Sequence, residues 1–487
     1  MADDLLELDD IQGLVMRGYG NLRASCYLLL EIGDARAARG WLGQLVGEIT
    51  AGRVRPERVA LNVAFTPVGL RKLGLPPETL ERFSTEFVEG VVGPHRSRLL
   101  GDVDESAPER WEWGGPGTRA VDVLLMLFAR DQATLSEAYL AQRDRMGAAG
   151  LVELAKLDTV DLGDREHFGF RDGVSQPVIA GSSRSAAPMH TIRPGEFLLG
   201  YPNEHAQVAE GPGLDPEQDP RGLLPRDPNG SGRADLGRNG SYLVFRQLKQ
   251  DVRRFWHFVD RATRNPDGSG DAAARTWLAS KLLGRWPSGA PLALTPHGDD
   301  PGLVDSNDFG YHARDREGFG CPIGAHVRRA NPRDSLDPNP GSQASIDVGK
   351  RHRILRRGRE YGQPVDPETL FRPDAPPSDG ADEERGLYFV CLCGNIARQF
   401  EFVQRTWIMS PKFGGLYDDP DPVVGAHPSG GGTFTVQAPT LRRRFGGLPR
   451  FVTVRGGGYF FLPGLRALRY LTNPSPTHPP AGGAAAR

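Results

Sequence analysis

The order of strands and helices in the first 160 residues is the feature that most limits the fold of this chain. A mostly apolar strand over 24–32 is followed by a helix that Asp34 caps, with apolar residues recurring at i, i+3, i+4, i+7 and i+8. Further strands are predicted over 59–65, 121–129 and 151–157, with a second capped helix over 131–145. The order β-α-β-β-α-β predicts a ferredoxin-like unit.

The same pattern starts again after residue 240. A strand over 242–248 precedes a helix marked by Val252, Phe255 and Val259, and a strand over 387–392 precedes a helix that Asn395 caps. A strand over 459–462 would close the sheet. Because 487 residues exceed the size at which one core keeps growing, we predict an α+β protein of two ferredoxin-like halves, antiparallel sheets with peripheral helices.

Changes in composition suggest where these parts begin and end. We predict a first half over 1–180, a long connection over 181–240 that is rich in Gly, Pro, Asp and Arg, and a second half over 241–473. An insertion over 263–384 would interrupt the second half. The segment 474–487 is rich in Pro, Gly and Ala, and it is predicted to be a disordered tail.

The charge of the chain argues against two classes of partner. Lys plus Arg number 59 and Asp plus Glu number 61, so a formal charge of −2 gives no general attraction to nucleic acid or to an anionic membrane. The start of the chain is acidic and no long apolar run follows, so we expect a cytoplasmic protein without a membrane segment. A small-molecule partner fits best, and no pattern indicates an oligomeric state.

The four cysteines are too few and too irregularly spaced for a disulfide framework. Cys391 and Cys393 lie one residue apart in an apolar run that is typical of a strand. Zinc-binding pairs usually leave two to four residues between their ligands. This spacing favours buried thiols over a metal or redox role.

Residues 167–177 read HFGFRDGVSQP and place one carboxylate, Asp172, beside a glycine shortly after a predicted strand. Glycine lets the backbone approach a bound group closely, so an aspartate at this point is positioned to transfer a proton. The short pattern Gly-x-x-Asp-Gly has little weight alone, because 62 glycines make a chance match common.

Residues 321–333 read CPIGAHVRRANPR and set His326 among small and apolar residues, ahead of several cations. A neutral imidazole with an apolar approach and basic neighbours suits a metal ligand beside an anionic cofactor. The alternative is a buried histidine that hydrogen bonds to backbone. The residues alone leave both interpretations open.

Residues 353–362 read RILRRGREYG. In an extended conformation Ile354 and Arg356 share one face and Leu355 and Arg357 the other, so one arginine can point inward while its neighbour stays in solvent. The alternative is a solvated or polyanion-binding cationic face. The near-zero total charge and the lack of interleaved aromatic residues argue against nucleic acid.

Together the three segments resemble the dye-decolorizing peroxidase family of haem proteins, and the likeness covers most of the chain. The shared stretches are GFRDGVSQP, CPIGAH with the later NPR, and RRG with the later YG, in the order in which the family has them. The long insertion is similar to that of the larger bacterial and fungal branch. The family fold, two ferredoxin-like halves with haem held mainly by the second, agrees with the pattern of strands and helices.

The resemblance implies an enzyme with one haem b, in which His326 ligates the iron and Asp172 and Arg356 stand on the opposite side of the ring. Such an enzyme reduces hydrogen peroxide and oxidises dyes, phenolics and similar aromatic one-electron donors through a ferryl porphyrin-radical intermediate. Asp172 would be the general acid and base, and Arg356 would stabilise developing charge. An aspartate with an ordinary pKa near 3.9 works in acid, so we expect an acidic pH optimum.

Further residues receive roles from the same resemblance. Glu401 is the candidate to accept a hydrogen bond from the second nitrogen of His326, with an ordinary exposed helix glutamate as the alternative. Leu387 and Phe389 would cover the peroxide side of the haem, although core packing explains them equally well. Arg333 is expected to pair with a haem propionate or, alternatively, with a surface carboxylate. His167 is expected to be structural.

A second function is compatible with the same segments. A haem-binding protein that carries, senses or removes iron from haem would need the same ligand but no peroxide chemistry. A protein without haem, in which the matches are coincidental, is the third possibility. An absorption spectrum separates the third from the first two, and the speed of the reaction with peroxide separates those two from each other.

Overall fold

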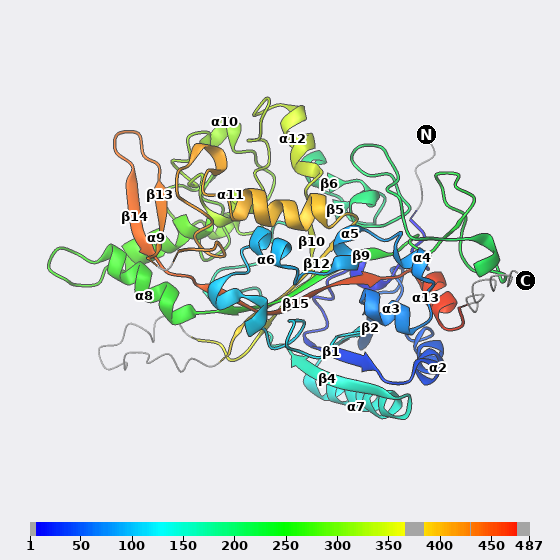
Figure 1. Ribbon diagram of the computed structural model, residues 1–487. Coiled ribbons are helices and arrows are strands. Elements are labelled where there is room, and N and C mark those ends of the chain that lie inside the picture. The colour runs from blue at the N-terminus through cyan, green and yellow to red at the C-terminus, as the bar shows by residue number, and fades with distance from the viewer. Residues whose placement is uncertain (1–5, 366–383, 429, 475–487) are drawn as a thin grey trace, which may run out of the picture.

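The computed structural model describes residues 6–365, 384–428 and 430–474, and within them one nine-stranded antiparallel sheet runs through the whole molecule (Figure 1). Its strands follow the order β10-β12-β9-β15-β2-β3-β1-β4, with β11 also paired to β12. The second half of the chain supplies one end of this sheet and the first half the other. The α+β class with two ferredoxin-like halves is therefore as predicted.

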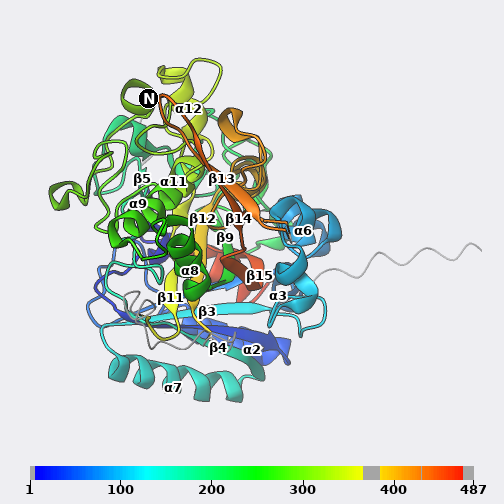
Figure 2. The ribbon, with the colours of Figure 1, turned by 90° about the vertical axis from the view of Figure 1, so that its left-hand side faces the viewer.

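The first half supplies β1 (Ala24–Ile32), β2 (Val59–Phe65), β3 (Val123–Ala129) and β4 (Leu151–Asp158), in the order β2-β3-β1-β4. Helices α2 (Ala35–Leu45) and α7 (Gln132–Ala148) cover one face, at the bottom of Figure 2. Both predicted caps are present, since Asp34 accepts hydrogen bonds from two backbone N–H groups and Asp131 accepts one from Thr134.

The second half supplies β9 (Ser241–Gln250), β10 (Leu355–Arg356), β11 (Arg359–Tyr361), β12 (Gly386–Cys393) and β15 (Val452–Leu462). Helix α8 (Val252–Thr263) follows β9, and the predicted second helix consists of the π-helical stretches η8 (Ala397–Glu401) and η9 (Val403–Ile408). Strands β10 and β11, which complete this half, lie inside the predicted insertion. Their two or three residues are too few for periodicity to reveal.

The two halves meet edge to edge. Strand β15 pairs with β2 at Phe461 and Phe65, so the two antiparallel sheets become one. Side chains alternate along β1, with Cys26, Leu28 and Leu30 in the apolar cluster on one face and Tyr27 and Leu29 in the cluster on the other. The boundaries predicted at 180, 240 and 473 stay predictions, and residues 475–487 of the predicted tail lie outside the described residues.

The remaining elements belong to the connections and the insertion. They are α1 (Gly13–Met16), α3 (Pro67–Lys72), α4 (Pro77–Leu80), α5 (Thr85–Glu89), α6 (Pro94–Leu100), α9 (Ala272–Leu283), α10 (His312–Asp315), α11 (His326–Ala330), α12 (Gln343–Lys350), α13 (Leu465–Leu471), β5 (Val178–Ile179), β6 (Thr191–Ile192), β7 (Gly213–Leu214), β8 (Ala234–Asp235), β13 (Gly432–Val436) and β14 (Arg443–Leu448).

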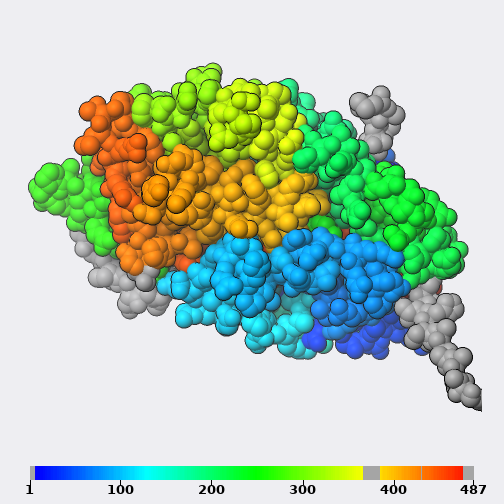
Figure 3. Space-filling view, turned by 45° about the horizontal axis from the view of Figure 1, so that its top comes forward, coloured from blue at the N-terminus to red at the C-terminus, as the bar shows by residue number. Residues whose placement is uncertain are grey.

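The insertion and the following segment gather on the side of the sheet opposite α7 (Figure 2). There the stretch from η8 to η9 lies beside the first half of the chain, and α6 contacts η9, so the blue and orange surfaces adjoin in Figure 3.

The cysteines are free and buried, and burial raises the pKa of the Cys391 thiol well above its ordinary value. This agrees with the predicted inert thiols. Among the described residues, none of the helices is both long and apolar enough to cross a bilayer.

Candidate active site

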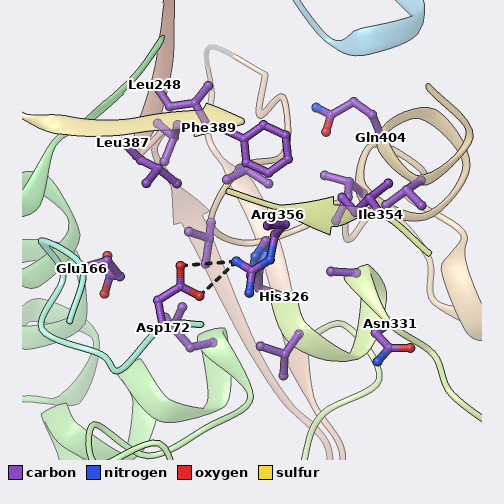
Figure 4. A pocket seen from close by; sticks show the side chains of 18 of the residues that line it. Glu166, Asp172, Leu248, His326, Asn331, Ile354, Arg356, Leu387, Phe389 and Gln404 are labelled. Atoms are coloured by element: carbon purple, nitrogen blue, oxygen red, sulfur yellow. Dashed lines mark hydrogen bonds and ion pairs between the residues drawn. The ribbon is translucent and has the colours of Figure 1, made fainter. Parts of the chain in front are cut away.

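A large cavity lies between the sheet of the second half and the insertion, and all three segments singled out in the sequence contribute to it (Figure 4). Asp172, His326 and Arg356 line it together, although they come from a loop, a short helix and a strand. In Figure 4 Asp172 and Arg356 point toward one another, with His326 beside Arg356. The tertiary structure thus brings the predicted constellation into one place.

The conformation of the loop around Asp172 explains its glycines. Gly169 and Gly173 have φ values of 96° and 80°, which residues with a β-carbon rarely adopt. Phe168 and Phe170 are buried in the apolar cluster around α8, and they anchor the loop on both sides of Gly169. The backbone N–H of Asp172 donates to the carbonyl of Asp164 at 2.9 Å. The side chain of Asp172 is left facing the cavity.

Asp172 and Arg356 form an ion pair in which Nη1 of Arg356 lies 2.9 Å from Oδ1 and 3.3 Å from Oδ2. Burial by itself would raise the pKa of Asp172, but the Arg356 charge, the Gly173 N–H and the hydrogen bonds from Arg356 outweigh it. The net shift of the Asp172 pKa is downward. Gln176 from the end of the same motif accepts a hydrogen bond from the Arg356 N–H at 3.2 Å, which ties the two segments together.

The predicted alternation of the 353–362 segment is right for one face and wrong for the other. Ile354 and Arg356 both line the cavity. Arg357 does not stay in solvent: its Nε and Nη2 donate to the carbonyls of Leu14 and Val15 at 2.7 and 2.8 Å. Both carbonyls belong to the short helix α1. The helix ends before a following turn can donate to them, so they accept from the donor-rich arginine instead.

His326 begins helix α11, and its Nδ1 donates to Oδ2 of Asp421 at 2.9 Å. Asp421 is fully buried, and its Oδ1 accepts from the N–H groups of Val423 and Val424 at 2.9 Å each. Burial opposes both charges, yet the pairing raises the pKa of His326 and lowers that of Asp421. The carboxylate holds the proton on Nδ1, so Nε2 is the nitrogen available to a metal.

The expectation for Glu401 is wrong. Its Oε1 accepts from Nη1 of Arg96 at 2.7 Å and from the hydroxyl of Tyr459 at 2.9 Å, so it bonds the first half of the chain to β15. Asp421 takes the place beside His326 instead. In the sequence Asp421 lies in the acidic stretch DDPDP at 418–422, and the apolar Val423 and Val424 directly after it are a local sign of burial.

Leu387 and Phe389, which are expected to cover the peroxide side of the haem, form part of an apolar wall of the cavity. Leu387 and Phe389 lie on one face of β12, and both line the cavity. Leu387 pairs in register with Leu248 of β9, which adds to the same wall (Figure 4). His167 lies outside this lining, buried, with Nε2 at 2.8 Å from the Tyr361 carbonyl, and burial lowers its pKa to about 4. It is structural, as expected.

Three buried arginines, Arg285, Arg333 and Arg353, line one part of the cavity and form no ion pair with a carboxylate of the described residues. Arg333 donates to the backbone oxygen and the side-chain oxygen of Asn307 at 2.6 and 2.7 Å. Burial, reinforced by the Arg333 and Arg356 charges, lowers the pKa of Arg353 to about 9. Buried cations without carboxylates are costly, so this region is suited to an anionic ligand.

The residues fit haem in each of its parts. A neutral imidazole nitrogen is available for iron, apolar side chains of β9 and β12 suit the ring, and unneutralised arginines suit the propionates. Nη2 of Arg353 and Nε of Arg333 have no hydrogen-bond partner among the described residues. The sequence does not distinguish Arg353 from its neighbours. It is one of six cations between residues 350 and 359, and no local signal separates a buried cation from the rest.

Comparisons with known proteins agree with this site. No family model matches the sequence. Dye-decolorizing peroxidase msp1 of Mycetinis scorodonius is 30% identical over 95% of this chain and 87% of its own length. Multifunctional dye peroxidase DyP2 of an Amycolatopsis species is 28% identical over 95% of this chain and 96% of its own length. The structure of an ancestral D-type dye-decolorizing peroxidase superposes with a TM-score of 0.76, at 27% identity, over 96% of this chain and 99% of that one.

The fold and the site define a haem peroxidase built from two ferredoxin-like halves. The chain belongs to the dye-decolorizing peroxidase family.

Proposed function

We propose that this protein binds haem b through His326, reduces hydrogen peroxide with the help of Asp172 and Arg356, and oxidises dyes, phenols and similar aromatic donors. One observation carries the proposal. The Asp172–Arg356 ion pair and the Nε2 side of a carboxylate-fixed histidine line the same cavity. Membership of the peroxidase family supports the same conclusion.

Haem, when bound, supplies the electrons that cleave the O–O bond of peroxide and then recovers them one at a time from the aromatic donor. The protein has to manage protons and charge. Leu387, Phe389 and Leu248 contribute an apolar wall that limits water near the reacting oxygens. In a water-poor site the charges of Asp172 and Arg356 act more strongly than they would in solvent.

Asp172 is proposed to move one proton. Its carboxylate accepts the proton from one oxygen of hydrogen peroxide and returns it to the other oxygen, which leaves as water. The lowered pKa keeps this carboxylate ionised, and so able to act as a base, in mildly acidic solution. This is the basis for the acidic optimum that we propose.

Arg356 is proposed to act in two ways. Its guanidinium holds Asp172 in place through hydrogen bonds to both carboxylate oxygens. The guanidinium charge also stabilises the negative charge that develops as the O–O bond breaks. Arg333 and Arg353 are proposed to hold the propionates, which fixes the ring relative to Asp172.

The test is the speed of the reaction with peroxide, followed by stopped-flow absorbance of the haem-loaded protein. Asp172→Asn is expected to slow it by about 10²–10⁴-fold, the usual contribution of a general acid–base group. Glu166→Gln is the matched control, because Glu166 is another carboxylate that lines the cavity but is not proposed to touch peroxide. A much smaller loss of the rate of reaction with peroxide is expected in Glu166→Gln. Equal rates in wild type and Asp172→Asn would favour haem carriage or iron release over peroxidase activity.

A further inference from the structure

Arg329 is the largest side chain in the described part of the protein that is fully shielded from solvent. It lies on α11, three residues after His326, and therefore on the helix that carries the proposed iron ligand. A buried arginine loses strong hydration, so its contacts must supply many hydrogen bonds in return. The mechanism described above makes no use of this residue.

The donors of Arg329 are directed to backbone carbonyls on three separate segments. Nε donates to Gly324 at 3.2 Å, immediately before α11. Nη1 donates to Trp407 at 2.5 Å and to Ser410 at 3.0 Å, where η9 ends. Nη2 donates to the carbonyl of Asp419.

These segments are the supports of the carboxylate beside His326. The loop from Ser410 to Asp419 leads into Asp421, whose own N–H donates to the Ile408 carbonyl at 2.8 Å. The ring of Phe413, in the middle of this loop, has its centroid 5.0 Å from the Arg329 guanidinium carbon. Arg329 therefore connects the helix of the histidine to both ends of the loop that delivers its carboxylate.

We propose that Arg329 is a positioning residue that sets the geometry of the Asp421–His326 hydrogen bond and, through it, the reduction potential of the iron. This inference rests on the proposed ligation of haem by His326. A proximal imidazole that donates to a well-placed carboxylate is more electron-rich and stabilises the oxidised iron. Loosening the loop lengthens or bends that hydrogen bond, so the potential rises.

The geometric role is separable from a purely electrostatic one because the two have opposite signs. Losing a buried positive charge near the iron stabilises the oxidised state and lowers the potential. Displacement of Asp421 from His326 raises the potential. Arg329→Lys keeps the charge but loses the planar fork that reaches three segments, so it isolates the geometric effect.

The experiment measures the ferric–ferrous midpoint potential and the iron–histidine stretching frequency of the ferrous protein in Arg329→Lys. We expect a higher potential and a lower stretching frequency than in wild type, both in the direction of Asp421→Asn. An unchanged potential and frequency in Arg329→Lys overturns the proposal. If this variant does not fold, Phe413→Leu replaces it, and a shift in the same direction but smaller is expected.

Arg328→Lys is the matched control, because it also keeps the positive charge and loses only the planar fork. Arg328 is also a buried arginine of α11, but its Nη1 donates to the carbonyls of Asp315 and Cys321 at 3.0 and 2.8 Å, in the insertion. The substitution at Arg328 is expected to lower the melting temperature and to leave the ferric–ferrous potential unchanged. A shift of the potential in Arg328→Lys as large as that in Arg329→Lys would mean that any damage to α11 has this effect, which contradicts a specific role.

The double variant Arg329→Lys/Asp421→Asn completes a thermodynamic cycle. If Arg329 acts through Asp421, the lysine substitution changes nothing further once Asp421 has lost its charge. An additive shift overturns the proposed route. If Asp421→Asn alone leaves both the potential and the stretching frequency unchanged, the proposed ligation by His326 fails, which is a different result from failure of the role of Arg329.

Discussion

Arg356 donates to both carboxylate oxygens of Asp172, at 2.9 and 3.3 Å, across a separation of 184 residues in the chain. The pair joins a glycine-flanked loop of the first half to a two-residue strand of the second. Their pairing places a base and a permanent cation next to each other at the cavity, and it makes the protonation of Asp172 depend on Arg356.

The acid limit of activity should depend on the charge at position 356. The pKa of Asp172 is lowered on balance, since the charge of Arg356 outweighs burial, and the working base therefore persists in acid. Arg356→Leu removes that charge, so the Asp172 pKa rises and the acid limb of the pH–rate profile moves to higher pH. Arg356→Lys keeps the charge and should move the limb less. Profiles of the rate of reaction with peroxide measure this, and identical acid limbs in wild type and Arg356→Leu would contradict it.

Haem binding should depend on His326 and not on another buried histidine, His167. His326→Ala is expected to lose most of the haem, or to change the Soret band of what remains, because the nitrogen available for iron is gone. His167→Ala is the control, since His167 is buried and bonded to the Tyr361 carbonyl. It should destabilise the fold but retain haem. Haem content per chain, measured after denaturing extraction, distinguishes the two, and equal retention would rule out His326 as the ligand.

Glu401 should prove to be a structural residue. Glu401→Gln weakens charged hydrogen bonds to Arg96 and Tyr459 in a buried setting, and a loss of about 2 kcal/mol in the free energy of unfolding is expected. The ferric–ferrous potential should stay at its wild-type value, because Asp421 is the carboxylate at His326. Denaturant titration and potentiometry of the same sample measure the two effects. A shift of the potential without loss of stability would restore the original expectation for Glu401.

His190 should make the protein less stable in acid. Burial and the charges of Arg333 and Arg353 lower its pKa to about 3. The unfolded chain binds a proton at this histidine below its ordinary pKa, about 6.5, while the folded protein does not. The contribution of His190 to the free energy of unfolding is therefore fully present above about pH 6.5. It declines as the pH falls toward 3, at up to about 1.4 kcal/mol per pH unit. His190→Gln should reduce this slope in unfolding titrations at a series of pH values, and an unchanged slope would assign the acid sensitivity to other groups.

Much of the fold was predictable because its signals are local. The limits of β1 and β2 agree residue for residue with the predicted 24–32 and 59–65, since alternation and apolar runs depend on neighbours in the chain. Asp34 and Asp131 cap their helices through backbone groups two or three residues away. Strands β10 and β11 escaped prediction because their pairing to β12, and not any pattern of their own, makes them strands.

The candidate site, like the fold, has features with a local signal and features that depend on distant segments. Residue types and their spacing single out the chemically unusual positions: an aspartate beside a glycine, a histidine among small residues, and an arginine next to an apolar side chain. Their partners come from the packing of distant segments: His326 pairs with Asp421, and Arg353 is buried but forms no ion pair with a carboxylate of the described residues. The physical reason is that composition and periodicity record what a residue can do, whereas hydrogen-bond partners, burial and charge balance arise only when distant segments pack together.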